Sequence, residues 1–156
     1  MGVANQKSIA WGIAEVLSIE GASLALTYQG DNFKKRVEPL AKSIGSNLVF
    51  DVDVTDEISV DKCFNELSKE WGSLDFVVHA LAFSDKSELS GRFINTSRKN
   101  FLNSLDISCF SLIDVAKKCS PLMKPGGAIL TLSYLGSQRV TPNYNVMGVA
   151  KAALES

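Results

Sequence analysis

The sequence predicts an α/β protein with a Rossmann-like, doubly wound parallel sheet and helices on both faces. Short apolar runs alternate with amphipathic segments of helical length along the chain. Strands that are apolar on both faces are typical of a parallel sheet buried between helices, and right-handed crossovers connect such strands. We therefore expect residues 1–156 to form a single dinucleotide-binding domain.

Composition and charge exclude several classes of partner. With 16 basic and 17 acidic residues the net charge is −1, so there is no electrostatic case for nucleic acid or an anionic membrane. No run is long and apolar enough to span a bilayer, and no signal peptide opens the chain, so we expect a cytoplasmic protein. Cys63, Cys109 and Cys119 lack metal-ligand spacing and His79 is the only histidine, so no metal site is expected.

The first turn and helix suit a phosphate group. Residues 2–10 read GVANQKSIA, a turn of small and polar residues that enters a helix with Ser8 as the expected N-cap. The apolar stripe of this helix is expected to comprise Ile9, Ile13, Val16 and Leu17. Backbone amides and the helix dipole favour an anion at such an N-terminus. A capped surface helix without a ligand is the alternative.

Leu24–Tyr28 is expected to be the second strand of a dinucleotide-binding fold, and Gln29 follows it directly. An acidic residue here would accept hydrogen bonds from an adenosine ribose, and an arginine would bind a 2′-phosphate. Gln29 is neither, so this position alone leaves the choice between NADH and NADPH open. The basic residues Lys34–Arg36 on the following helix support NADPH as a minority alternative, although a solvated helix face explains them better.

The third strand, Asn47–Phe50, is followed by acidic residues. A carboxylate at a strand end, here Asp53, can accept a hydrogen bond from an adenine amino group. The alternative is that Asp53 belongs to an N-cap cluster for the next helix, Asp56–Glu70, for which Thr55 and Asp56 are the cap candidates.

The remaining elements continue the alternation. Leu74–Val78 is the fourth strand, and the small residues after it would let a ribose approach the backbone. Lys86–Thr96 is polar and irregular, and Ser97–Cys119 is a long helix that ends before Pro125–Gly127 and a fifth strand at Ala128–Leu132. The apolar stripe of the long helix is expected to comprise Phe101, Leu105, Leu112, Ala116 and Cys119.

The segment Ser133–Lys151, which follows the fifth strand, carries the candidate chemistry. It contains Tyr134, Tyr144 and Lys151. Seven residues span about two helical turns, so Tyr144 and Lys151 are expected to share one helix face. A phenol and an ammonium at the carboxyl end of a strand can polarise a carbonyl oxygen and bind a ribose. The structural alternative is a buried tyrosine pair with a solvated lysine.

This segment resembles the active site of bacterial NADH-dependent enoyl-acyl-carrier-protein reductases, a family within the short-chain dehydrogenase/reductase superfamily. The wider superfamily uses Tyr-x3-Lys, whereas Gly148 stands four residues after Tyr144. The enoyl reductase pattern is Tyr-x6-Lys with a second tyrosine ten residues before the first, which Tyr134, Tyr144 and Lys151 match. The resemblance covers essentially the whole chain and implies that these three residues are catalytic.

The same resemblance implies the residues around a cofactor and a substrate. The glutamine at position 29 implies NADH, with NADPH less favoured. His79–Phe83 is similar to the family's His-x-Ile-x-Phe, with Leu81 in place of isoleucine and no catalytic role for His79. The implied cofactor-binding residues are Gly2, Ser8, Ile9, Gln29, Asp53, Val54, Leu81 and Lys151. The implied substrate-binding residues are Ser84, Tyr134 and Tyr144.

The resemblance therefore implies an NADH-dependent enzyme of type II fatty acid biosynthesis. It would reduce the trans-2 double bond of enoyl thioesters held on acyl carrier protein, as a cytoplasmic homotetramer. The alternatives are a 3-ketoacyl (carbonyl) reductase on the same scaffold and an inactive fragment. By family length we expect a truncated copy, or a reading frame begun at an internal methionine, without the C-terminal lid and without the first strand. The first strand would lie between the second strand, Leu24–Tyr28, and the fourth, Leu74–Val78. Without it, the backbone groups of both strands on that side would lack hydrogen-bond partners.

Overall fold

The computed structural model describes all 156 residues, Met1–Ser156, which form two compact units. Unit 1 comprises residues 1–80 and 118–130, and unit 2 comprises residues 81–117 and 131–156. No helix combines the length and the apolar character needed to cross a membrane.

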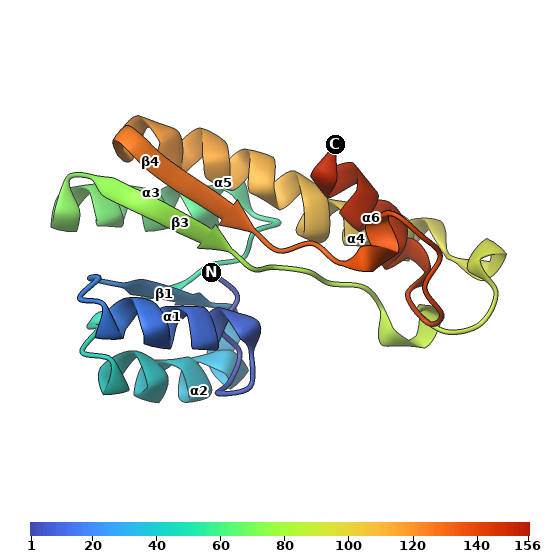
Figure 1. Ribbon diagram of the computed structural model, residues 1–156, viewed down its shortest axis with the longest axis horizontal. Coiled ribbons are helices and arrows are strands. Elements are labelled where there is room, and N and C mark those ends of the chain that lie inside the picture. The colour runs from blue at the N-terminus through green and yellow to red at the C-terminus, as the bar shows by residue number, and fades with distance from the viewer. The chain divides into compact units, whose positions relative to one another are not determined.

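Unit 1 has the predicted α/β architecture, with short strands and helices that alternate along the chain (Figure 1). Its helices are α1 (Ile9–Ile19), α2 (Gly30–Ser43) and α3 (Glu57–Trp71). Its strands are β1 (Ala25–Tyr28), β2 (Leu48–Asp51), β3 (Leu74–His79) and most of β4 (Met123–Thr131). The predicted fold class is therefore confirmed.

The strands of unit 1 form two separate pairs. β1 and β2 are parallel, in a register that runs from Ala25 opposite Leu48 to Tyr28 opposite Asp51. β3 and β4 form the second pair, and their arrows run the same way in Figure 1. The sheet is thus divided between β1 and β3, which is where a further strand was expected.

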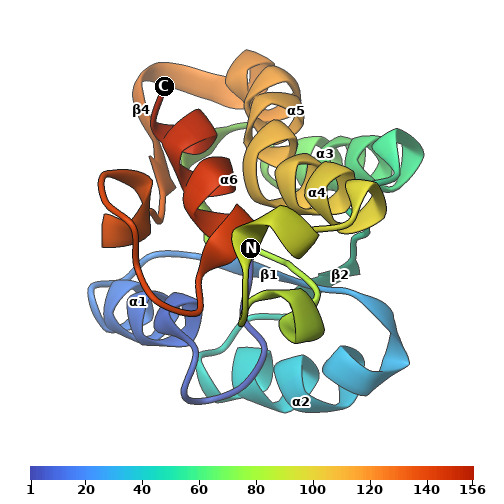
Figure 2. The ribbon, with the colours of Figure 1, turned by 90° about the vertical axis from the view of Figure 1, so that its right-hand side faces the viewer.

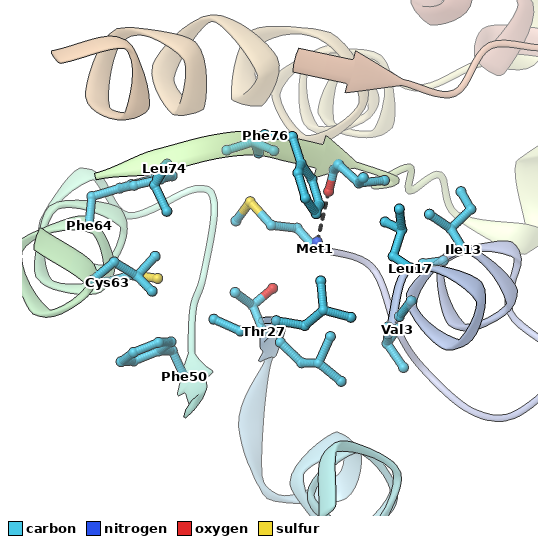
Figure 3. Close-up of a pocket in the computed structure, with 18 of the residues that line it drawn as sticks. Met1, Val3, Ile13, Leu17, Thr27, Phe50, Cys63, Phe64, Leu74 and Phe76 are labelled. Atoms are coloured by element: carbon cyan, nitrogen blue, oxygen red, sulfur yellow. Dashed lines mark hydrogen bonds between the residues drawn. The ribbon is translucent and has the colours of Figure 1, made fainter. Parts of the chain in front are cut away.

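An apolar cavity separates β1 from β3 (Figure 3). The residues around it include Val3, Ile13, Leu17, Leu26, Phe50, Phe64, Leu74 and Phe76. Met1 lies beside β3 in a strand-like pairing, because its terminal nitrogen donates to the carbonyl of Val78 (2.7 Å) and its own carbonyl accepts from the amide of Ala80 (3.1 Å).

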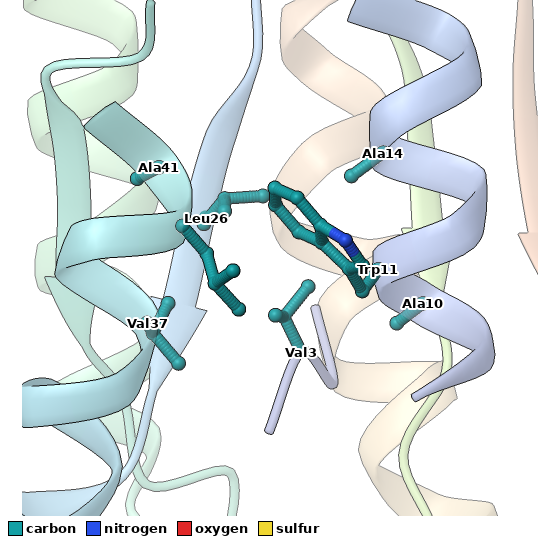
Figure 4. Packing of buried hydrophobic residues seen from close by; sticks show 8 residues of the cluster. Val3, Ala10, Trp11, Ala14, Leu26, Val37 and Ala41 are labelled. Carbon is teal, nitrogen blue, oxygen red and sulfur yellow. The ribbon is translucent and has the colours of Figure 1, made fainter. Parts of the chain in front are cut away.

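The hydrophobic core that borders this cavity is organised around Trp11 (Figure 4). The indole packs among Val3, Leu26 and Val37, so α1 buries Ala10, Trp11 and Ala14. The predicted stripe is therefore wrong in part: Ile13 and Leu17 line the cavity, whereas Ile9 and Val16 are exposed. Burying the large indole removes more apolar area from water than burying either aliphatic side chain, which sets the rotation of the helix.

Unit 2 is helical. The predicted long helix is present but interrupted: α4 (Arg98–Leu105) leads through a π-helical turn at Asp106–Phe110 into α5 (Ser111–Cys119). The last helix, α6 (Asn145–Glu155), packs against α4 and the π-helical turn (Figures 1 and 2).

The predicted apolar stripe of the long helix is wrong in part. Cys119 is buried, but Phe101, Leu105, Leu112 and Ala116 are only half-buried, and the rest of the buried face is largely polar. The buried residues are Asn100, Ser104, Ser108, Ser111, Asp114, Val115 and Cys119. Burying hydroxyl groups is tolerated when they are hydrogen-bonded, and here they are: Ser108, for example, donates to the carbonyl of Phe83 (3.1 Å) and Ser111 to that of Ile107 (2.6 Å).

Three further local features differ from the predicted ones. β4 begins at Met123 instead of Ala128, so it includes the proline and glycines of Pro125–Gly127, which an edge strand can accommodate. The irregular segment contains short 3₁₀ turns at Lys86–Glu88 and Phe93–Asn95. α6 begins after Tyr144, which occupies the N-cap position and not a helical one.

Candidate active site

The two predicted tyrosines are neighbours in unit 2. The rings of Tyr134 and Tyr144 meet edge to face, with centroids 4.8 Å apart and planes inclined by 60°. Tyr134 follows β4 and is half-exposed, and Tyr144 precedes α6. Burial, and then the neighbouring Tyr134, raise the pKa of the Tyr144 phenol. Tyr144 therefore stays protonated at neutral pH and can donate a hydrogen bond or a proton.

Two glycines make room for Tyr144. A Cβ on Gly136 would overlap the Tyr144 ring, so the ring lies directly against this backbone. A Cβ on Gly148 would lie 2.8 Å from the carbonyl oxygen of Gly136, closer than side chains approach. Gly148 holds the position at which the Tyr-x3-Lys pattern would require a lysine. The local packing therefore excludes that arrangement and leaves Lys151 as the available ammonium.

Lys151 is buried, with only 5% of its surface exposed. Its Nζ donates to the carbonyl oxygen of Leu132, the residue after β4, at 2.7 Å. Burial lowers the pKa of this ammonium, which Cys109 partly opposes. The alternative of a solvated lysine is wrong, because Lys151 is buried. A buried ammonium is costly, and such groups are candidates for a functional site.

The turn that carries Tyr134 is fixed to α6 by Glu155. The carboxylate accepts hydrogen bonds from the hydroxyls of Ser133 and Ser137, the latter at 2.6 Å. These two hydroxyls, first Ser133 and then Ser137, hold the pKa of Glu155 below its usual range. Sequence reasoning missed Glu155, although its position four residues after Lys151 puts both on one helix face.

The predicted substrate residue Ser84 is held by a buried asparagine. Asn100 donates from Nδ2 to the Ser84 hydroxyl (3.1 Å), and its Oδ1 accepts from the amide of Asp85 (2.8 Å). Leu81, three residues earlier, is half-buried. Sequence reasoning also missed Asn100, for which the only signal was a polar residue early in a helix.

The loop before α1 is shaped by Gly2 and Ser8. Gly2 has a φ of 103°, and a Cβ there would overlap the carbonyl oxygen of Ala80, so the backbones of the two segments touch. Ser8 stands at the N-cap position, but the expected cap hydrogen bond is absent. Its hydroxyl instead donates to the carbonyl of Asn5 (2.6 Å) and accepts from the amide of Ala4 (3.3 Å), because the tight loop brings both groups to it.

The structure brings Gln29 and Asp53 together. Burial acts to raise the pKa of Asp53, but hydrogen bonds from the Thr55 amide (2.9 Å), the Thr55 hydroxyl (2.7 Å) and the Gln29 side chain outweigh it and lower the pKa. Asp53 is therefore an ionised acceptor at neutral pH. The N-cap of α3 is Asp56, which accepts from the amide of Ile58 (3.0 Å), so Asp53 is not needed as the cap.

The predicted site residues fall into two sets. Unit 1 contains the set Gly2, Ser8, Ile9, Gln29, Asp53 and Val54, in which Ile9 is exposed. Unit 2 contains the set Leu81, Ser84, Tyr134, Tyr144 and Lys151. No group of three His, Cys, Asp or Glu side chains is arranged to hold a metal ion.

An α/β fold with a tyrosine and a buried lysine after a strand defines the class of short-chain dehydrogenases/reductases. The family model for enoyl-(acyl carrier protein) reductase matches residues 2–156. The chain belongs to this family.

Similar proteins agree with this assignment. The enoyl-[acyl-carrier-protein] reductase [NADH] 1 of Rhizobium meliloti is 56% identical over 156 residues, which are 100% of this chain and 57% of that protein. A crystal structure of the Anaplasma phagocytophilum reductase in complex with NAD is 60% identical with a TM-score of 0.95, over 99% of this chain and 59% of the other. The Bacillus cereus reductase with NADP⁺ and indole naphthyridinone is 48% identical with a TM-score of 0.96, over 99% of this chain and 61% of the other. The chain thus spans about three fifths of the relatives it matches.

Proposed function

We propose that the protein is an NADH-dependent enoyl-acyl-carrier-protein reductase of type II fatty acid biosynthesis, which reduces the trans-2 double bond of enoyl thioesters. The observation that carries this proposal is the packing of Gly148 against Gly136 beside a buried Lys151, because it favours Tyr-x6-Lys over Tyr-x3-Lys. The same observation disfavours a 3-ketoacyl reductase. The names of the relatives, which are NADH-dependent enoyl reductases, support the same activity.

The residues of unit 1 fit a dinucleotide. Gly2 lies against the backbone of Ala80, in the loop that leads to the N-terminus of α1, and Ser8 and Ile9 follow it. Backbone amides at a helix N-terminus suit a pyrophosphate. Asp53 is an ionised acceptor for the adenine amino group, next to Val54, and Gln29 would face the adenosine ribose. NADH, when bound, supplies the hydride. The NADP⁺ in the Bacillus cereus relative is a reason to test NADPH beside NADH.

The residues of unit 2 would stabilise the charge that develops on the substrate. After hydride reaches C3 of the enoyl thioester, negative charge collects on the thioester oxygen. Tyr144, protonated at neutral pH, would hydrogen-bond that oxygen and supply a proton. Lys151 would bind the nicotinamide-ribose hydroxyls, and its positive charge would favour the enolate. Tyr134 and Ser84 would border the acyl group, with Leu81 toward the cofactor.

The partners proposed are acyl carrier protein, which would deliver the substrate, and other copies of the same chain in a homotetramer. The outer face of α4, the π-helical turn and α5 supports assembly, because three large apolar side chains lie exposed on it: Leu102, Phe110 and Ile113. Cys63, Cys109 and Cys119 form no disulfide bond, which supports a reducing compartment, the cytoplasm.

The deciding experiment is NADH oxidation by the purified protein with crotonyl and acetoacetyl thioesters in parallel, repeated with NADPH. We expect oxidation of NADH with the enoyl substrate only. Preference for the keto substrate would establish the carbonyl reductase instead. No oxidation with either substrate would contradict activity of this chain and favour the inactive fragment.

The first prediction is that Tyr144→Phe lowers kcat for the enoyl substrate by about 10²–10³-fold, because one hydrogen-bond donor to a developing oxyanion is removed. NADH binding, followed by fluorescence titration, is expected to stay within about twofold. Tyr28→Phe, at the end of β1 in unit 1, is the matched control and should leave kcat unchanged. Unchanged turnover in Tyr144→Phe would contradict the catalytic role.

A further inference from the structure

The backbone on both sides of Tyr144 is unusual. Asn143 has a φ of 57° and Asn145 a φ of 33°, and both lie in the left-handed region that residues other than glycine seldom adopt. Tyr144 lies between them with φ −120° and ψ −23°. Asparagine tolerates this conformation better than other side chains, yet it still costs free energy, so neighbouring contacts must hold it.

The contact that holds Asn145 is made by its own side chain. Its Nδ2 donates to the carbonyl oxygen of Glu88 at 2.9 Å, and the carbonyl oxygens of Ser90 and Gly91 lie at 3.5 Å. All three carbonyls belong to one short stretch of chain, residues 88–91. The amide therefore ties the residue after Tyr144 to a segment more than fifty positions earlier in the sequence.

That segment is itself fixed, so it can serve as an anchor. The Glu88 carboxylate accepts from the amide of Ser97 (2.8 Å) and from Nδ2 of Asn100 (3.2 Å). Asn100, which is buried, also accepts from the amide of Asp85 through Oδ1 (2.8 Å). The stretch from Asp85 to Gly91 is thus bound to α4 on one side and to the start of α6 on the other.

We propose that Asn145 is a positioning residue for Tyr144: its amide, bound to the Glu88 carbonyl, maintains the left-handed backbone that aims the phenol. Asn143 differs, because it shares the left-handed backbone but its side chain is exposed. The importance of the phenol for catalysis rests on the proposed function, whereas the positioning of its ring does not.

The test separates the effect of the Asn145 side-chain amide from the effect of backbone flexibility. Asn145→Gly keeps the left-handed conformation accessible and removes the amide, and Asn143→Gly makes the same change in chain flexibility without removing that contact. With ¹³Cζ-labelled tyrosine, NMR resolves the three tyrosines of the chain. We expect the Tyr144 resonance to shift and broaden and its phenol pKa to fall toward its ordinary value in Asn145→Gly. In Asn143→Gly both should stay as in the parent. In Asn145→Asp the change should be larger, because a carboxylate would face the Glu88 carbonyl.

The outcomes are distinguishable. An unchanged Tyr144 resonance in Asn145→Gly, or equal changes in both glycine variants, would overturn the proposal, and the Tyr28 resonance reports whether unit 1 is still folded. Where the parent oxidises NADH, Asn145→Gly is expected to lower kcat by about 10–100-fold while the KM for NADH stays constant. A parent without activity leaves the NMR comparison intact and contradicts only the proposed function.

Discussion

At the scale of single residues, α6 holds the segment after β4 with two side chains of opposite charge. Lys151 donates to the carbonyl of Leu132, and one turn later Glu155 accepts from Ser133 and Ser137. The two contacts together fix the start of the turn that carries Tyr134. Glu155 thus stabilises the segment that carries Tyr134, and this stabilisation requires the ionised carboxylate.

The pH dependence of stability tests Glu155. Its pKa is lowered from 4.5 by the two serine hydroxyls, so its stabilising effect is fully present above the unfolded value and is lost as the pH falls through the folded value. We expect Glu155→Gln to lower the urea midpoint at pH 7, and we expect the difference from the parent to shrink as the pH falls below 4.5. The control is Glu15→Gln, at an exposed carboxylate in the middle of α1, which should leave the urea midpoint unchanged. Equal midpoints of Glu155→Gln and parent at pH 7 would contradict this role.

At the scale of elements, the approach of the Gly136 turn to α6 decides which helix positions can carry a functional group. Gly148 is the point of closest contact, so the helix can present a side chain toward the site only one turn later, at Lys151. The spacing of the tyrosine and the lysine is therefore a packing property of this pair of elements. The interruption of the long helix by a π-helical turn belongs to the same region, and such turns occur often at functional sites.

Two glycine-to-alanine changes test the close contact between Gly148 and the Gly136 carbonyl, one at Gly148 and one, as a control, at Gly12. In a helix interior alanine is normally more stable than glycine by roughly 0.5–1 kcal/mol. At Gly12 in α1 a Cβ meets no atom within 4 Å, so Gly12→Ala is expected to stabilise by about that amount. At Gly148 the Gly136 carbonyl is in the way, so Gly148→Ala is expected to destabilise by about 1–3 kcal/mol and to displace Tyr144. Urea denaturation measures both, and a stabilised Gly148→Ala would refute the close contact.

At the scale of the whole molecule, the exposed apolar face of unit 2 bears on assembly. Leu102, Phe110 and Ile113 are 57%, 47% and 60% exposed, although large apolar side chains are costly in water. They lie on the face opposite the buried serines of the same helices. A symmetric interface between copies of one chain uses the same surface patch on each copy, and this apolar patch is our candidate for it.

Sedimentation equilibrium tests the assembly. We expect a particle of four times the 16.9 kDa of one chain, and a smaller particle for Ile113→Glu, because the charge would have to be buried. Ile58→Glu makes the same substitution in α3 at a side chain that is 77% exposed, and should leave the mass unchanged. A monomeric parent, or equal effects of both variants, would exclude this face as the interface.

Much of the fold could be predicted locally. The alternation of strands and helices and the Asp56 cap of α3 were predicted, because apolar periodicity and capping act over a few residues. The buried faces of α1 and of the long helix were predicted only in part. A single Trp11 set the rotation of α1. In the long helix, serines occupy much of the buried face, and Ser108 can be buried because the carbonyl of Phe83, distant in sequence, accepts from its hydroxyl.

For the candidate site, the sequence by itself determined which residues are candidates for the chemistry: the tyrosine pair, Lys151 and the acceptor Asp53. Residue type and spacing suffice for that, since they set which groups can donate, accept or carry charge. Only the tertiary structure decided the surroundings of these groups. It buries Lys151, packs the Tyr144 ring against Gly136, and lets the Asn145 amide donate to the carbonyl of Glu88. The physical reason is that burial and hydrogen-bond geometry depend on segments far apart in the chain, which no local pattern encodes.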